Sequence, residues 1–389
     1  MAAGQAASST DPAVARGAAL SKLGGCQGCH TGEGGAPFAG GRPIGTPFGA
    51  VYSTNITPDP ATGIGRWSEA DFRRAIRDGV APGGQQLYPA FPYDHFTRLT
   101  DQDIADLYAF LRSRDPVQAP AHPNKVEFPF NIRPLIGVWK ALYFRHASVP
   151  NDPAQSAEWN RGRYLVLALG HCGGCHTPRN SLGAEHWDRE LSGGWVDAWY
   201  APPLDRASPA AKAWTVEALE TYLRTGLSVD HAAAAGPMGG VTQELATAPP
   251  EDVHAMAVYI AAGIGTGADH MADNAAAAAA RPEGARLFAG ACANCHDAGA
   301  PMMNEGRPDL TLGSPLHETD PADTVLIILQ GLKPPAERDG PSMPAYAAAF
   351  SDQQVAQIAG YLRARYTSDP PWPGELTRAV AKARKAAHG

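Results

Sequence analysis

The chain has 389 residues, of which 44% are apolar, and its formal net charge is −7. This length allows two to four domains with small cores. Because basic residues form no clustered excess, we exclude nucleic acid as a partner.

The sequence contains no segment that predicts export or membrane insertion. Met1 leads directly into a polar stretch of small residues, without the basic and apolar regions of a signal peptide. We therefore expect a mature or trimmed N-terminus. No run of about 18 apolar residues is present, so no membrane span is predicted.

A cysteine pair followed at once by histidine occurs three times, at residues 26–30, 172–176 and 292–296. Each CxxCH motif is a signature of c-type haem attachment. Two thiols one helical turn apart can add to the two vinyl groups of one porphyrin, and the adjacent imidazole then lies under the iron. A single copy is also compatible with a zinc half-site or a thioredoxin-like redox pair. Three copies use all six cysteines, which leaves none for disulfides, a four-cysteine zinc site or a nucleophile.

The motifs therefore predict three covalently bound haem c groups. We expect thioether bonds at six cysteines and proximal iron ligands at three histidines: Cys26, Cys29, Cys172, Cys175, Cys292, Cys295, His30, His176 and His296.

The expected elements repeat in the same order around the motifs. A short helix that opens with glycine precedes each motif, at about residues 16–25, 162–171 and 284–291. A middle helix that ends in glycine follows each motif, at about residues 67–79, 214–226 and 321–331. Ser68 and Thr215 are the expected N-caps of the first two. An amphipathic helix closes each repeat, at residues 101–112, 250–262 and 351–366. No strand pattern competes, so the sequence predicts an all-α fold of three tandem monohaem cytochrome c-type domains.

We expect these domains at residues 12–114, 159–263 and 282–367. The connection 115–158 is rich in proline and aromatic residues, too apolar to stay solvated, and should pack as a strap over a domain or a partner surface. The connection 264–281, rich in glycine, aspartate and alanine, is expected to be a spacer. Residues 368–389 form a basic tail, which is either a solvated end or a segment that contacts a membrane surface or partner.

Methionine on a loop well downstream is the common sixth ligand of a c-type iron. Gly226 and Gly331 end the second and third middle helices, and Met238 follows Gly226 at the same spacing as Met343 follows Gly331. We expect Met238 and Met343 to be the sixth ligands of the second and third haems.

The first repeat departs from this pattern. The same spacing counted from Gly79 reaches Phe91, which cannot bind iron, and apart from Met1 the predicted domain has no methionine. His95, four residues beyond Phe91, is the favoured donor because four extended residues reach roughly 13 Å. His122, His146 and an open or water-bound site are the alternatives.

Several stretches carry a resemblance to a known family. They are Asn55–Asp59, Trp67-Ser68, the LYPAFPY stretch of Leu87–Tyr93 and the FPFNIRPL stretch of Phe128–Leu135. Residues 15–366 resemble the triple-haem cytochrome c subunits of periplasmic, membrane-associated bacterial dehydrogenases. The resemblance implies electron flow from a catalytic dehydrogenase subunit of molybdopterin, flavin or quinone type, through three haems, to ubiquinone or a terminal oxidase. It also implies a periplasmic location peripheral to the inner membrane. In alcohol- and gluconate-type members methionine stands at the position of Phe91, so the phenylalanine favours the aldehyde and molybdenum-hydroxylase group.

The sequence thus favours an electron-transfer subunit with no substrate chemistry of its own. If His95 binds the first iron, this His/His site should have a lower potential than the His/Met sites. The main rival is a peroxidase-type haem enzyme with an open first site. A structural or docking subunit whose haems are incidental is a third interpretation.

Overall fold

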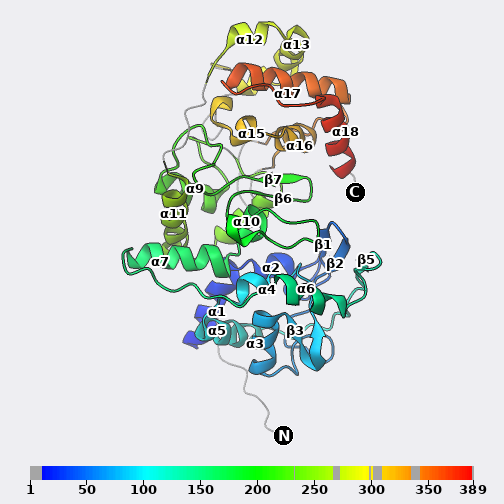
Figure 1. Cartoon of the computed structure of the whole chain (residues 1–389), viewed down its shortest axis with the longest axis vertical. Helices are drawn as coiled ribbons and strands as arrows, with labels where there is room; N and C mark the ends of the chain where they lie inside the picture. The colour runs from blue at the N-terminus through cyan, green and yellow to red at the C-terminus, as the bar shows by residue number, and fades with distance from the viewer. Residues whose placement is uncertain are drawn as a thin grey trace. The chain divides into compact units, whose positions relative to one another are not determined.

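A computed structural model describes residues 11–231, 233–265, 272–297, 299–300, 309–333 and 342–387 (Figure 1). The chain forms two compact units. The first runs to Gly174 and includes Asn180–Glu185 and Thr247–Met256, and the second comprises Cys175–Arg179, His186–Ala246 and the chain from Ala257 onward. Among the described residues, no helix has both the length and the apolar character that crossing a bilayer requires.

The three helices expected in the first repeat are present, and the middle one has its predicted caps. They are α1 (Pro12–Leu23), α3 (Glu69–Asp78) and α5 (Asp101–Arg112). Ser68 and Asp71 form a reciprocal capping box at the start of α3. Gly79 ends α3 in the left-handed conformation, with φ of 60°. The boundaries of α3 and α5 therefore follow from local sequence chemistry.

Glycine allows the opening and closing helices of a repeat to cross closely. A Cβ at Gly17 of α1 would lie 2.0 Å from the carbonyl oxygen of Asp106 in α5. In the third repeat, a Cβ at Gly284 of α13 (Pro282–Ala291) would lie 2.4 Å from the carbonyl oxygen of Gln357 in α17 (Asp352–Tyr366). These distances leave no room for a side chain. Helix packing is thus the reason for glycine at positions 17 and 284.

An arginine next to the glycine strengthens this crossing in the first two repeats. Arg16 binds the Asp106 carboxylate through two nitrogens, at 2.6 and 2.9 Å. Arg161, on α7 (Ala157–Tyr164), binds Asp252 on α11 (Pro250–Ile264) in the same way, at 2.7 and 3.1 Å. Bidentate pairs of this kind fix orientation as well as distance.

Short strands interrupt the helices, which corrects the expected all-α class. The strands are β1 (Pro43–Thr46), β2 (Gly49–Tyr52), β3 (Val80–Ala81), β4 (Gln85–Gln86), β5 (Lys125–Val126), β6 (Gly194–Val196) and β7 (Trp199–Ala201). All pairs are antiparallel: β1 with β2, β2 with β5, β3 with β4 and β6 with β7. Strands of two to four residues are too short to show the alternation of apolar and polar residues that reveals a strand in sequence.

The strap packs on the first repeat by one face. Its helix α6 (Leu135–Tyr143) buries Ile136, and Nζ of Lys140 donates to the carbonyl oxygens of Asp78 and Gly79 at 2.6 and 2.7 Å. Lys140 thereby satisfies carbonyl groups at the end of α3. The opposite face of the strap stays exposed at Phe128, Ile132, Leu135, Val138 and Leu142.

The middle helix of the second repeat, α9 (Val216–Thr225), has the predicted caps. The Thr215 side chain accepts from the amide of Ala218, and Gly226 ends the helix with φ of 73°. The helix before the second CxxCH motif differs from a plain α-helix. It begins as α7 and continues as the π-helical segment η2 (Leu165–Leu169), all of whose residues are buried.

The third repeat has a core built from α13, α15 (Ser314–His317), α16 (Ala322–Gln330) and α17. The expected tail belongs to this core. Its helix α18 (Leu376–Ala387) packs beside α16 and α17 (Figure 1) and buries Val380 and Ala383, while Trp372 is 5% exposed. Residues 368–387 are therefore part of the third domain rather than a separate end.

The alanine-rich connection is also attached to the third domain. Its run of alanines forms α12 (Ala275–Ala279), which contacts α17 and buries Ala278. The amide of Asn274 donates to the carbonyl oxygen of Arg365 at 2.7 Å. This part is not the expected spacer. Residues 266–271 of that connection lie outside the described ranges.

Candidate haem sites

Each CxxCH motif lies on a single helical turn. These turns are α2 (Cys26–Cys29), α8 (Gly173–His176) and α14 (Ala293–His296). The amide of His30 donates to the carbonyl oxygen of Cys26 at 2.9 Å, and the amide of His296 donates to that of Cys292 at 3.0 Å. Because a helical turn takes 3.6 residues, the two cysteines of a motif lie on the same side of it. This is the arrangement that attachment of one porphyrin requires.

The motif histidines of the first two repeats are held in one tautomer. Nδ1 of His30 donates to the carbonyl oxygen of Thr54 at 2.7 Å, and Nδ1 of His176 donates to that of Pro202 at 2.6 Å. Burial lowers the pKa of both imidazoles, which favours the neutral form. A neutral imidazole that donates through Nδ1 has its lone pair on Nε2, the usual arrangement of a metal-binding histidine. His30 and His176 therefore fit the role of iron ligands.

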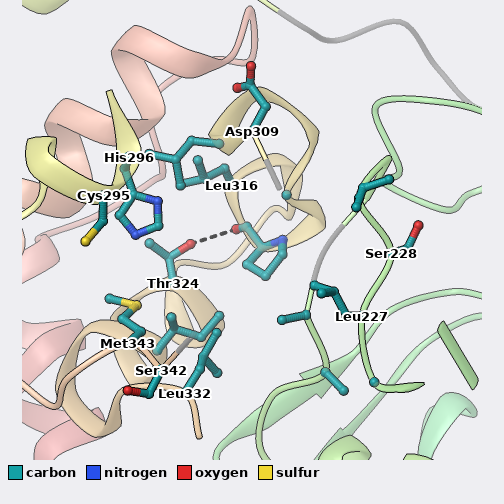
Figure 2. A pocket seen from close by; sticks show the side chains of 18 of the residues that line it. Leu227, Ser228, Cys295, His296, Asp309, Leu316, Thr324, Leu332, Ser342 and Met343 are labelled. Carbon is teal, nitrogen blue, oxygen red and sulfur yellow. Dashed lines mark hydrogen bonds between the residues drawn. The ribbon is translucent and has the colours of Figure 1, made fainter. Parts of the chain in front are cut away.

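A cavity of about 860 Å³ surrounds the third motif (Figure 2). This volume lies within the range of about 300–1,000 Å³ that is typical of cofactor pockets. Cys292, Cys295, His296 and Met343 all line it. Figure 2 shows Cys295, His296 and Met343 along one wall and Leu227 and Ser228 across from them.

The chemistry of this lining fits a haem. Two thiols are available for the vinyl groups, and an imidazole and a thioether for the iron. Burial raises the pKa of the Cys292 thiol to about 11, so it is protonated at neutral pH. The apolar side chains of Leu310, Leu316, Ile328 and Phe350 complete the walls.

Two family descriptions match parts of the chain. Residues 14–115 match "Cytochrome c", and residues 279–362 match "Cytochrome C oxidase, cbb3-type, subunit III". The fructose dehydrogenase cytochrome subunit of Gluconobacter japonicus is 34% identical, over 92% of this chain and 80% of that protein. The cytochrome c subunit of alcohol dehydrogenase (quinone) from Gluconacetobacter polyoxogenes is 36% identical, over 95% of this chain and 84% of that protein. The chain belongs to the family of multihaem cytochrome subunits of bacterial dehydrogenases.

A further relative of this cytochrome subunit is a much longer protein. It is a nicotinate dehydrogenase subunit of Pseudomonas putida, which is 44% identical over 94% of the chain. The chain spans only 31% of that protein's length.

A backbone pairing follows the middle helix in each repeat of the cytochrome subunit, and its register can be compared with Phe91, Met238 and Met343. Val80 pairs with Gln86 in the first repeat and Leu227 with Ala233 in the second, so the paired residues are six positions apart in both repeats. Phe91 and Met238 then both lie five residues beyond the closing pair, which supports their equivalence. In the third repeat Leu332 pairs with Met343 itself. The equal spacing from the helix-ending glycines therefore corresponds to different pairing registers in the second and third repeats.

The two predicted methionine ligands differ in their surroundings. Met343 lines the third cavity, and its backbone is fixed by two hydrogen bonds with Leu332, at 2.8 and 2.9 Å. Met238 is half-buried at the start of α10 (Pro237–Leu245). Met238 stays a prediction from the sequence.

His95 is engaged by other groups of the protein, and its expected role as an iron ligand stays a prediction. The residue lies on α4 (Tyr93–Phe96), and its side chain is 0% exposed. Nδ1 lies 3.1 Å from the carbonyl oxygen of Leu167, and Nε2 lies 3.0 Å from a carboxylate oxygen of Glu185. Although burial opposes the charged form, the Glu185 carboxylate raises the pKa of His95. With both nitrogens bonded, His95 has no lone pair for an iron in this arrangement.

The two alternative histidines of the first repeat are surface residues. The His146 side chain is 69% exposed, with Nδ1 3.1 Å from the hydroxyl of Thr97. His122 is exposed and stacks on Tyr52, with ring centroids 5.4 Å apart. A haem ligand should be buried beside the haem, and neither of these side chains is buried.

Sequence reasoning missed the partners of His95. Glu185 lies 90 residues away along the chain, and Leu167 lies 72 residues away. Neither belongs to a motif, and a lone glutamate between two repeats gives no signal. His171, which precedes the second motif, contacts the ring of Phe96 in the first repeat.

Proposed function

We propose that this chain is an electron-transfer subunit with three covalently attached haem c groups. Haem c, when bound, supplies the one-electron chemistry. The six motif cysteines would hold the haems, and His30, His176 and His296 would bind the irons. Met238 and Met343 would complete the second and third sites. The observation that carries the proposal is the third cavity, where two thiols, His296 and Met343 meet in an apolar lining.

Two backbone carbonyl groups near the motifs orient the imidazoles that would bind iron. The carbonyl oxygens of Thr54 and Pro202 orient the imidazoles of His30 and His176. Saturation of an iron by histidine and methionine leaves no position for a substrate, which suits electron relay rather than catalysis.

We assign the catalytic partner to the molybdenum-hydroxylase or aldehyde type. Support comes from Phe91, which stands where alcohol- and gluconate-type subunits carry methionine. The 44% identity to the nicotinate dehydrogenase subunit also exceeds the 34% and 36% identities to the fructose and alcohol dehydrogenase subunits. The electrons would pass to ubiquinone or a terminal oxidase. Because haem is attached outside the bacterial cytoplasm, we place the mature protein in the periplasm, peripheral to the inner membrane.

Haem stoichiometry tests this proposal directly. We expect the exported protein to carry three haems by intact mass and by haem absorbance. Replacing both cysteines of one motif by alanine should remove one haem at a time. A wild-type protein with fewer than three attached haems would overturn the proposal.

The partner is tested by mixing the purified cytochrome with a nicotinate-type and an alcohol-type dehydrogenase. Reduction of the cytochrome by only the alcohol-type enzyme would contradict the assignment.

A second function is favoured by the first site. Phe91 occupies the methionine position, and His95 is bound to Glu185 and Leu167. The first iron would then keep an open position for a small ligand, as in a peroxidase. Binding of cyanide or carbon monoxide by one haem of three would support this function, and three low-spin spectra unchanged by either ligand would exclude it.

A further inference from the structure

The segment that leads into the second CxxCH motif makes close contacts with the first repeat, all within the first compact unit. It consists of the π-helical segment η2, then Gly170 and His171. The carbonyl oxygen of Leu167 in η2 lies 3.1 Å from Nδ1 of His95 and accepts a hydrogen bond from Arg98 at 3.0 Å. A π-helical turn inside an α-helix is rare and is frequent at functional sites. Here it turns a carbonyl group toward two side chains of the first repeat.

The same segment touches the entrance of the first motif. A Cβ at Gly24, two residues before Cys26, would lie 3.1 Å from the Leu169 side chain and 3.4 Å from its carbonyl oxygen. The carbonyl oxygen of Gly24 also lies close enough to the imidazole of His171 to raise its pKa. The residues that precede the first and second attachment sites are therefore in direct contact.

His171 also contacts the loop of the first repeat that corresponds to the sixth-ligand loops of the other two. Its ring meets that of Phe96 edge to face, with centroids 5.5 Å apart. Phe96 in turn meets the ring of Phe91, at 5.4 Å. His171 thus connects both sides of the first haem site with the start of the second motif.

The backbone of His171 is held in an uncommon conformation. Its φ is 39°, in the left-handed region that few non-glycine residues adopt. Burial, with the nearby charge of His95, lowers the pKa of His171 to about 4, so the imidazole is neutral at physiological pH. His171 is half-buried, and strained backbone of this kind is typical of functional positions.

We propose that His171 is a positioning residue that couples the first and second haem sites by holding their two attachment loops against each other. This inference rests on the proposed function, because it requires a haem at each loop. One electron would move between the two sites, which oxidises one iron and reduces the other, with no proton transferred. His171 would keep the two attachment loops in contact for that step.

The test compares variants that separate the imidazole from the backbone. His171→Gly accepts the positive φ but removes the ring, and His171→Asn accepts it and keeps a short donor. After rapid photoreduction of the full chain, absorbance reports how fast electrons redistribute between the first two haems. We expect His171→Gly to slow this step about tenfold or more, the scale on which removed second-shell partners act. His171→Asn should fall between His171→Gly and the wild type, and the potential of the third haem should not change.

Two further variants make the test decisive. Gly24→Ala pushes the same contact apart from the first-repeat side without touching His171, and should also slow the step. His186→Leu, at a histidine whose side chain is 40% exposed, is the matched control and should leave the rate unchanged. Full-rate transfer in both His171→Gly and Gly24→Ala, with three haems attached, would overturn this inference alone. If His171→Gly loses the second haem, Gly24→Ala decides the outcome. Fewer than three haems in the wild type would instead overturn the proposed function.

Discussion

Replacing Gly331 by alanine should disrupt the third haem site, because Gly331 packs against the backbone of Met343. Gly331 has φ of 70° and ψ of −176°, a conformation that is almost exclusive to glycine. A Cβ there would lie 2.3 Å from the carbonyl oxygen of Met343 and 2.8 Å from the amide nitrogen of Ala345. The methyl group therefore forces apart the hydrogen bonds between Leu332 and Met343, at 2.8 and 2.9 Å.

Two costs add in the Gly331→Ala variant. The strained conformation costs about 1–3 kcal/mol, and forcing a methyl group into a packed site costs about 1–3 kcal/mol. We expect the free energy of unfolding to fall by about 2–6 kcal/mol in urea titrations. Because Met343 moves, the oxidised spectrum should also lose one methionine-to-iron charge-transfer band.

Gly290→Ala is the matched control for this variant. Gly290 is exposed on α13, and a Cβ there would meet no atom within 4 Å. Alanine in a helix interior is more favourable than glycine by about 0.5–1 kcal/mol, so this variant should be slightly more stable than the wild type. If Gly331→Ala unfolded at the same urea concentration as Gly290→Ala and kept every charge-transfer band, the reasoning about Gly331 would be refuted.

Three further predictions concern buried groups. Asp323 accepts a hydrogen bond from the amide of Tyr200 at 2.8 Å, and burial raises its pKa to about 7. The folded protein then binds more protons than the unfolded chain between about pH 4 and 7, so the free energy of unfolding falls by up to about 4 kcal/mol as pH rises. Asp323→Asn should flatten this dependence in urea titrations at about pH 5 and 8, and an unchanged slope would contradict it. Glu185→Gln leaves His95 without its carboxylate and should cost about 3 kcal/mol near pH 6, less at higher pH where His95 loses its proton; equal thermal stability of variant and wild type would exclude a role for the pair. Met343→Leu should change the free energy of unfolding by less than about 1.5 kcal/mol yet lower the potential of one haem in a spectroelectrochemical titration, whereas three unchanged potentials would rule out Met343 as a ligand.

Much of the helical framework could be predicted because it depends on neighbouring residues. Ser68 and Asp71 cap α3 through groups three positions apart, and Gly79 ends the helix by its own conformational freedom. The closing helix of the first repeat has the predicted bounds, Asp101–Arg112, because its apolar residues recur at helical spacing. The strands could not be predicted because each has at most four residues, too few to show an alternation of apolar and polar residues.

The contacts of His95 could not be predicted for a different reason. Its position beyond Phe91 made it the nearest donor in sequence, but proximity along the chain does not decide which group an imidazole meets. In the folded chain Glu185 and Leu167 bind both of its nitrogens. The tail was misjudged in the same way, since its basic residues are conspicuous in sequence while the apolar contacts of Val380 and Ala383 appear only in the core.

The sequence by itself determined the chemistry of attachment, because CxxCH is contiguous and one helical turn places its three functional side chains together. It also determined the order of the three repeats and the loss of methionine at Phe91. Only the tertiary structure decided which groups from distant segments meet: Met343 with His296 in one cavity, Glu185 with His95, and His171 with Gly24. Such contacts depend on how helices cross and on which groups become buried together. The spacing of residues along the sequence predicts neither.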